Sequence, residues 1–285
     1  MQQPVFFSHN GSNHSLLVLV GYLQLQKSET LRAPIAVSSI MAAPYKHVTL
    51  VTGANQGIGF ETAKKLATEH SNYHVILTGR SEKALQEAVA KLNALGLSNV
   101  EPIVMDITSD ESIAAAVKAV ESKHGRLDVL INNAAVSSLE RDSLREVYVS
   151  VYNTNVVSQA MVTDAFIPLL EKAQFAKRVV NVTSGLGSMQ DKLDKSAFVH
   201  KVDHPPYSVS KSALNQLTLH YVTRYEDDPT WKFNLTCPGF CATNLNNYAG
   251  TDDPALGAVN SCRLATLGLD GPTGTWTNRN GTIKW

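Results

Sequence analysis

Short apolar runs with almost no polar interruption alternate with amphipathic segments from residue 47 to the end of the chain. His47–Val51, Tyr73–Thr78 and Leu127–Ile131 are runs of this kind. A strand that is apolar at nearly every position is buried on both faces, as in parallel sheets that are covered by helices on both sides. The alternation therefore predicts an α/β fold with a single doubly wound parallel sheet.

The same pattern predicts the remaining elements. Further strands are expected at Val100–Met105, Arg178–Val182, Lys232–Cys237 and Thr273–Thr277. Helices are expected at Gly57–His70, Ser81–Leu95, Asp110–His124, Pro206–Glu226 and Pro254–Leu267, with a long helical region, broken once, from about Asp142 to Lys172. No repeat or linker interrupts the series, so residues 44–285 are predicted to form one domain.

Residues 1–43 differ from the rest of the chain. Their apolar run, Leu16–Val20, is too short to span a bilayer and has no preceding Lys or Arg, unlike a signal peptide. We expect an extension that is disordered, or a start codon assigned too far upstream, since Met41 stands just before the first strand.

A glycine-rich turn directly follows the first strand. Residues 52–59 read TGANQGIG, and a helix is expected to begin within them. Glycines allow positive φ and let the backbone approach a pyrophosphate at a helix N-terminus. Between a strand and a helix, this turn predicts a dinucleotide site on a Rossmann-like sheet; the alternative is a glycine-rich turn without a ligand.

Four more motifs follow in a fixed order. They are NNAA at 132–135, NVTS at 181–184, YSVSK at 207–211 and PG at 238–239. Together with the glycine turn, they resemble the short-chain dehydrogenase/reductase family, in particular its carbonyl-reductase-like branch, over roughly residues 46–285. Ala135 stands where most members have glycine. The resemblance implies an NADP-binding catalytic domain that reduces a ketone or aldehyde to an alcohol, or the reverse, with a small-molecule carbonyl or alcohol as substrate.

The resemblance also implies a catalytic group of Ser184, Tyr207, Lys211 and Asn155, with Asn153 as a less favoured candidate for the last position. Tyr207 and Lys211 share one helix face, and we expect the ammonium to lower the pKa of the phenol toward neutral pH. Tyr207 would protonate the carbonyl oxygen, and Ser184 would donate a hydrogen bond to it. Lys211 would hold the ribose of the cofactor, and Asn155 would position a proton-relay water.

The second expected strand ends in Gly79-Arg80, where an acidic residue would select NAD(H). Glycine leaves room for a 2′-phosphate and a guanidinium can bind it, so NADP(H) is favoured. Asp106 would pack on the adenine, cap the next helix, or do both. The predicted cofactor-binding residues are Gly53, Asn55, Gln56, Gly57, Ile58, Gly59, Arg80, Asp106, Ile107, Asn133, Ala134, Tyr207, Lys211, Pro238, Gly239 and Thr243.

The stretch between Ser184 and Tyr207 is longer than in most members. Its polar part, about 189–204, is expected to be a solvated loop, and His200, Asp203 and His204 within it are not expected to bind a metal. Members with an insertion here tend to be monomers, so a monomer is favoured. Walls of the substrate site are expected from this insertion, Ser137–Arg141, Asn244–Pro254 and Trp285.

Charge and cysteine content narrow the partners and the compartment. The 25 basic and 25 acidic residues balance, so neither nucleic acid nor an anionic membrane is expected as a partner. The three cysteines, Cys237, Cys241 and Cys262, form no disulfide framework and are expected to be free thiols in a reducing, cytoplasmic setting.

Two alternatives to this enzyme are weighed against the same residues. A non-catalytic NADP-binding sensor or scaffold of the same fold would typically lack the Tyr or the Lys, and both are present. A sugar-nucleotide epimerase or dehydratase would have a differently spaced glycine turn and a longer C-terminal part.

Overall fold

The computed structural model describes residues 46–137 and 142–285, so the expected extension 1–43 lies outside the described residues. The strands are β1 His47–Val51, β2 Tyr73–Gly79, β3 Val100–Val104, β4 Val129–Asn132, β5 Lys177–Val182, β6 Trp231–Thr236, β7 Trp276–Asn278 and β8 Gly281–Thr282. The helices are α1 Gly57–Glu69, α2 Glu82–Ala94, α3 Asp110–His124, α4 Leu144–Tyr152, α5 Ser158–Leu170, α6 Met189–Leu193, α7 Phe198–Lys201, α8 Pro205–Arg224 and α9 Pro254–Ala265.

The strands form one sheet in the order β3-β2-β1-β4-β5-β6-β7-β8, which confirms the predicted doubly wound α/β fold. Strands β1 to β7 pair in parallel, and only the short β8 runs antiparallel, to β7. The sequence did not predict β8, and the last parallel strand lies later than the expected Thr273–Thr277. Gly274 has φ of +70° and so interrupts the extended backbone before β7.

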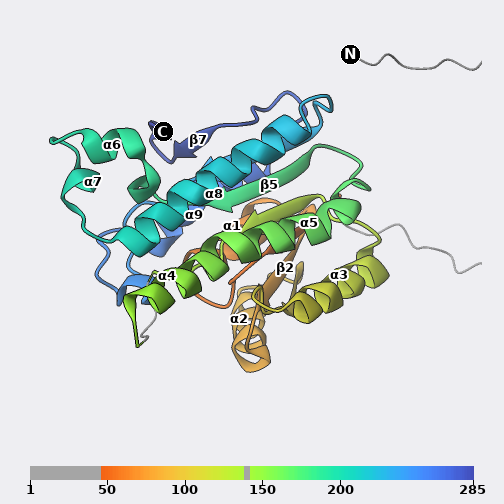
Figure 1. Cartoon of the computed structure of the whole chain (residues 1–285). Coiled ribbons are helices and arrows are strands. Elements are labelled where there is room, and N and C mark those ends of the chain that lie inside the picture. Colours follow the sequence, from red (N-terminus) through yellow and green to blue (C-terminus); the bar gives the residue numbers. More distant parts are fainter. Residues whose placement is uncertain (1–45, 138–141) are drawn as a thin grey trace, which may run out of the picture. The chain divides into compact units, whose positions relative to one another are not determined.

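Helices cover both faces of the sheet (Figure 1). On one face, apolar residues of α1, α2 and α9 form a core with side chains such as Val75 and Leu77 of β2. On the other, residues of α3, α5 and α8 form a second core with Ile76 of the same strand. Successive side chains of a strand point to opposite faces, so a fully apolar strand supplies both cores at once.

The long helical region is continuous where the sequence suggested a break. Helix α4 passes through a π-helical turn, Asn153–Val157, directly into α5. A π turn holds one extra residue and therefore changes the facing of side chains without ending the helix. Ser143 begins the region with a capping box that includes Glu146.

The insertion before α8 differs in part from the expected solvated loop, because it contains the short helices α6 and α7. The ammonium of Lys192 in α6 donates to the carbonyl of Val202 at 2.7 Å, which links the two helices. Many of its side chains are exposed, among them Met189, Leu193 and Phe198. The monomeric state that the insertion suggested stays a prediction.

The order of the strands reverses between β1 and β4, from which the chain proceeds toward opposite edges of the sheet. Loops diverge at such a point and leave a crevice at the carboxyl ends of the strands. Within the described residues, no helix combines the length and the apolar character that crossing a bilayer requires.

The first residue of β1 gives a test of the packing at the opposite, amino end of the sheet. His47 is 6% exposed and packs on the rings of Tyr73 and Phe175, with centroids 4.5 Å and 5.0 Å away. Burial, with help from the positive charge of Arg178, lowers the pKa of His47 to about 4. The imidazole is therefore neutral in the folded protein at pH 5, whereas it is largely charged in the unfolded chain.

At acidic pH the unfolded chain binds a proton at His47 that the folded protein does not. The free energy of unfolding is therefore undiminished above a pH of about 6.5 and is lowered as the pH falls through 4. Urea unfolding of the wild type and of His47→Gln at pH 7 and pH 4.5 should show a loss larger by about 1–3 kcal/mol for the wild type. His220→Gln, at an exposed position of α8, is the control and should behave as the wild type. Parallel pH dependence of wild type and His47→Gln would contradict the assignment.

Candidate functional site

A cleft of about 430 Å³ lies at the carboxyl ends of the strands and contains most of the predicted cofactor-binding residues. Those that line it are Gly53, Asn55, Gln56, Gly57, Ile58, Arg80, Asp106, Ile107, Asn133, Ala134, Tyr207, Lys211, Pro238 and Thr243. Gly59, Gly239, Ser184 and Asn155 do not line it. Further lining residues that sequence reasoning left unassigned include Thr154, Val182 and Thr183.

In the glycine turn, the backbone lies so close to other chain segments that a side chain would not fit. Gly53 has φ of +63°, and a Cβ there would lie 2.9 Å from the Cα of Ala134. At Gly59 a Cβ would lie 2.5 Å from the side chain of Asn133 and from the carbonyl of Gly53. Gly59 therefore serves close packing of α1 on the turn, and not the wall of the cleft.

The N-terminus of α1 opens onto the same cleft. Its N-cap residue, Gln56, makes no side-chain hydrogen bond to the first turn, whereas Ser81 caps α2 and Ser109 caps α3. Backbone N–H groups and the positive end of the helix dipole are thus left for an anionic ligand. The uncapped helix start, the glycine turn and the elongated cleft together fit the phosphate groups of a dinucleotide.

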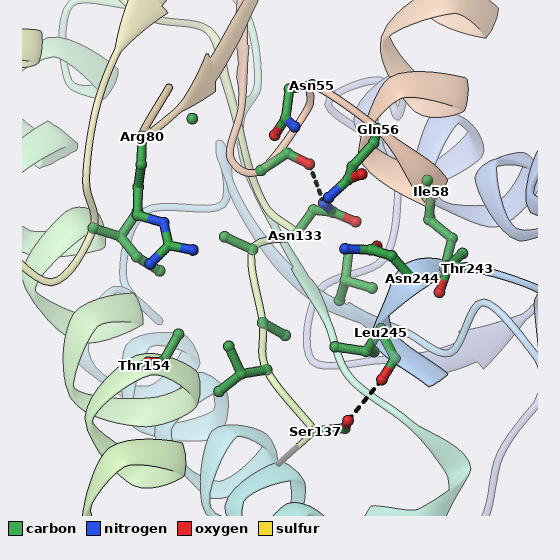
Figure 2. Close-up of a pocket in the computed structure, with 18 of the residues that line it drawn as sticks. Asn55, Gln56, Ile58, Arg80, Asn133, Ser137, Thr154, Thr243, Asn244 and Leu245 are labelled. Carbon is green, nitrogen blue, oxygen red and sulfur yellow. Dashed lines mark hydrogen bonds between the residues drawn. The ribbon is translucent and has the colours of Figure 1, made fainter. Parts of the chain in front are cut away.

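Asn133 and Thr52 hold the glycine turn against the loop that follows β4. The side-chain amide of Asn133 donates to the carbonyl of Thr52 at 2.9 Å and to that of Gly53 at 3.2 Å, and Figure 2 shows the second of these bonds. The hydroxyl of Thr52 accepts from the N–H groups of Asn133 and Ala134, both at 2.9 Å. Sequence reasoning assigned no role to Thr52, although its place at the head of the glycine motif was the available signal.

Arg80 extends into the cleft from the end of β2 (Figure 2). It is exposed and makes no ion pair with any residue in the described ranges. A Cβ at the neighbouring Gly79 would lie 3.1 Å from the amide oxygen of Asn55, so the glycine lets Asn55 approach the end of the strand. An anionic group in this part of the cleft would have a guanidinium within reach.

Asp106 lines the cleft but does not cap α3. Its carboxylate accepts from the N–H of Thr108 at 2.9 Å and from the Thr108 hydroxyl at 2.7 Å. The cap of α3 is Ser109, whose hydroxyl accepts from the N–H of Ser112 at 3.2 Å. The suggested capping role of Asp106 is therefore wrong, because its carboxylate forms the turn that precedes the cap.

The turn after β5 brings Ser184 to the beginning of α8, which carries Tyr207 and Lys211. A Cβ at Gly187 would lie 2.9 Å from the backbone carbon of Lys211, so the turn and the helix are in direct contact. The Lys211 ammonium donates to the carbonyl of Val182 at 2.9 Å and lies 5.6 Å from the centre of the Tyr207 ring. The three predicted side chains are thus adjacent, although Ser184 and Tyr207 are separated by the insertion.

Burial dominates the electrostatics of this group. It raises the pKa of the Tyr207 hydroxyl far above its usual range, against the opposing effect of a hydrogen bond from Ser184. Burial also lowers the pKa of Lys211 to about 8. The expectation that the ammonium brings the Tyr207 pKa down is therefore wrong for the protein alone, since desolvation of a phenolate outweighs the attraction. Tyr207 is held as the protonated phenol at neutral pH.

Asn155 is fully buried in the π-helical turn, whereas its competitor Asn153 is exposed. Its amide oxygen accepts from the N–H of Val136 at 2.9 Å, and its NH₂ donates to the carbonyl of Val136 at 2.8 Å and to the hydroxyl of Ser210 at 3.1 Å. Both amide hydrogens are used, so this side chain ties the loop after β4 to α8 next to Tyr207.

The segment after β6 closes over one side of the cleft. Ser137, from the loop after β4, donates to the carbonyl of Leu245 at 2.7 Å and joins the two sides (Figure 2). Of the expected wall Asn244–Pro254, Asn244 and Leu245 line the cleft. Of the expected wall Ser137–Arg141, Ser137 lines it and residues 138–141 lie outside the described residues.

Trp285 does not belong to this wall, contrary to expectation. Its backbone oxygen accepts from Gln190 at 2.8 Å, and its ring packs on Trp276 with a centroid distance of 5.5 Å. It lines a separate hollow beside α8 together with Met189 and Leu219.

All three cysteines are buried free thiols. Cys237 lies beside the predicted catalytic side chains, and its sulfur accepts from the N–H of Gly185 at 3.1 Å. Burial raises its pKa, so the thiol is protonated at neutral pH.

Known proteins resemble this chain in both sequence and fold. Residues 47–254 match the profile of the short chain dehydrogenase family. The short-chain dehydrogenase anuI of Penicillium roqueforti is 40% identical over 80% of this chain and 92% of its own length. The (+)-neomenthol dehydrogenase of Capsicum annuum is 29% identical over 81% of this chain and 95% of its own. An NADPH-bound carbonyl reductase from chicken fatty liver superposes with a TM-score of 0.71 at 26% identity, over 85% of this chain and all of the other.

The two hydrogen bonds that Thr52 accepts predict a specific cost for losing its hydroxyl. Thr52→Val keeps the shape but leaves the N–H groups of Asn133 and Ala134 without that acceptor, and should lower the free energy of unfolding by about 1–3 kcal/mol. Thr49→Val is the matched control, because Thr49 is equally buried on β1, the strand that Thr52 directly follows, and its hydroxyl has no partner among the described residues. Urea unfolding should find Thr49→Val neutral or stabilised; equal losses in both variants would contradict the role given to Thr52.

Proposed function

The chain belongs to the short-chain dehydrogenase/reductase family, and on this premise we propose that it is an NADP(H)-dependent oxidoreductase acting on a small ketone or aldehyde, or on the corresponding alcohol. The proposal rests on one continuous cleft that is lined both by groups suited to binding phosphate and by side chains suited to proton transfer. The glycine turn, the α1 N-terminus and Arg80 line it, as do Tyr207 and Lys211. This is the arrangement that a long, phosphorylated cofactor and a reacting carbonyl require.

The cofactor-binding residues divide by chemistry. The backbone N–H groups at the start of α1 suit the pyrophosphate, and the Arg80 guanidinium suits a 2′-phosphate. Asp106 and Ile107 would flank the adenine, while Asn133, Lys211 and Thr243 would hold the nicotinamide half. When bound, the cofactor supplies the hydride that reduces the carbonyl carbon.

Tyr207 is assigned the proton transfer. Its buried hydroxyl is protonated at neutral pH, and so it can donate to the carbonyl oxygen as negative charge develops there. Ser184, hydrogen-bonded to Tyr207, would donate to the same oxygen and stabilise that charge. The Lys211 cation would favour the phenolate that forms, until solvent returns a proton.

Asn155 is assigned a positioning role. It fixes the Val136 backbone of the cleft wall and the first turns of α8, through hydrogen bonds of 2.8–3.1 Å. The proposal also assigns Asn155 the positioning of a proton-relay water. The π-helical turn that contains it, an irregularity in the helix backbone, would support this role.

The names of the relatives favour an oxidoreductase that acts on a small molecule. They include a carbonyl reductase with NADPH bound and a (+)-neomenthol dehydrogenase. The rival function, an NADP-binding sensor without catalysis, is disfavoured because Lys211 is 2% exposed and still directed at Tyr207. Cofactor binding would use Lys211 alone, whereas proton transfer also uses the hydrogen-bonded pair of Ser184 and Tyr207 that lies beside it. Oxidation of NADPH in the presence of a panel of ketones and aldehydes separates the two functions.

Replacing the proposed proton donor gives a direct test of the mechanism. Tyr207→Phe keeps the ring and the helix but removes the donated proton, so kcat should fall by about 10²–10⁴-fold. NADPH affinity, measured by fluorescence titration, should change little. Tyr225→Phe, at the end of the same helix and packed on Trp231, is the control and should keep wild-type turnover. Tyr207→Phe with a tenth or more of wild-type kcat would exclude Tyr207 as the acid.

The choice of cofactor depends on Arg80. Arg80→Asp should repel a 2′-phosphate and raise KM for NADPH on the order of 10–100-fold. The phosphate lies far from the reacting carbon and is bound equally in ground and transition states, so kcat should stay near the wild-type value. Lys91→Asp makes the same charge change at an exposed position in the last turn of α2 and should leave KM unchanged. Equal use of NADH and NADPH by the wild type, or an unchanged ratio of the two activities in Arg80→Asp, would refute the NADP(H) assignment but not the proposed oxidoreductase function.

A further inference from the structure

Two histidines and a glutamate meet far from the cleft, at the amino ends of the edge strands. His74 is the second residue of β2, Glu101 the second residue of β3, and His124 the last residue of α3. Chain segments distant in sequence therefore contribute one side chain each, and one Nε2, Nδ1 or carboxylate oxygen of each lies within 4.8 Å of the others. No role in the proposed reaction involves them.

The two imidazoles converge on a single carboxylate oxygen. Glu101 Oε1 lies 3.2 Å from His74 Nε2 and 2.6 Å from His124 Nε2. The other oxygen, Oε2, accepts from the Lys123 ammonium at 2.8 Å. Lys123 thereby fixes the orientation of the carboxylate, as an outer partner of a metal ligand does, and leaves Oε1 directed at both rings.

We propose that His74, Glu101 and His124 form a binding site for a divalent transition metal ion of the Zn²⁺ type. Two imidazole nitrogens and one carboxylate oxygen are a donor set that such ions bind, with solvent as a fourth ligand. Metal–ligand bonds of about 2.1 Å in a tetrahedron separate the ligand atoms by about 3.4 Å. The His74–Glu101 distance is already close to this value, and the His124–Glu101 contact would have to open by less than 1 Å.

The surroundings favour a cation at this place. The site lies at the C-terminus of α3, where unpaired carbonyls and the negative end of the helix dipole face the last residues. The side chains of His74, Glu101 and His124 are 10%, 18% and 13% exposed, so the site is accessible to an ion yet largely shielded from water. Partial shielding strengthens the attraction between an ion and its ligands.

The role of the ion would be structural. His74 and Gly79 lie at opposite ends of β2, about 16 Å apart in an extended strand, and Gly79 is the residue that lines the cleft. An ion held by His74 is thus too far away to act on a bound carbonyl. It would instead join β2, the edge strand β3 and α3, and stabilise this side of the sheet. The inference therefore does not depend on the proposed oxidoreductase function.

Equilibrium dialysis and calorimetry of the full chain, stripped with a chelator, would test for the site with Zn²⁺ alone as the probe. We expect one ion per chain and, with Co²⁺ in its place, the visible absorption of a tetrahedral complex. At a Zn²⁺ concentration of about 100 times Kd, Tm should rise by about 5–10 °C. NADPH oxidation should be the same with and without the ion.

Three variants make the test specific. His124→Gln and Glu101→Gln retain hydrogen-bonding side chains but lose a ligand, and each should weaken Zn²⁺ binding by at least about 100-fold, since outer partners alone account for 10–100-fold. His220→Gln removes an exposed histidine of α8 and should bind as the wild type. The proposal is overturned if the wild type binds no stoichiometric Zn²⁺, or if both ligand variants bind it as tightly as His220→Gln. If one ligand variant does not fold, the other decides.

Discussion

The close approach of three chain segments at the reversal of strand order is the constraint on which the rest of the site depends. The turn after β1, the start of α1 and the loop after β4 meet where Gly53 and Gly59 have no room for a Cβ. Asn133 then binds the carbonyls of that turn with its side-chain amide. Because these contacts are short and fully formed, the uncapped N-terminus of α1 is held at the mouth of the cleft.

A second close approach, between the turn after β5 and α8, brings the proposed acid–base group together. Gly187 allows the backbone of the turn to contact the backbone at Lys211, so Ser184 remains next to Tyr207 whatever the length of chain between them. The insertion begins after this turn and ends before α8, so the contact does not depend on its length. Burial then sets the protonation of the group more strongly than charge does, since it raises the pKa of Tyr207 and lowers that of Lys211.

The helix termini at the two ends of the sheet have opposite polarity. At the carboxyl ends of the strands, the N-terminus of α1 and Arg80 favour anions. At the amino ends, Glu101 and the C-terminus of α3 favour cations. This division follows from the parallel arrangement, in which every helix that connects two strands runs back across the sheet and presents the same pole to the same end.

Local pattern was enough to predict the doubly wound sheet and most element bounds within two residues, because strand burial, glycine conformation and i,i+4 spacing are encoded over a few neighbouring positions. Many of the cleft residues, by contrast, were predicted from the resemblance to the short-chain dehydrogenase/reductase family. The sequence by itself thus determined the fold and most of the residues that line the cleft. Only the tertiary structure decided how the surroundings affect these residues. It raises the pKa of Tyr207 and engages the side chain of Asn155 in hydrogen bonds to the protein. It also packs Trp285 on Trp276, away from the cleft, and brings His74, Glu101 and His124 together. Desolvation and contacts between distant segments arise only when the chain is packed, so no local spacing records them.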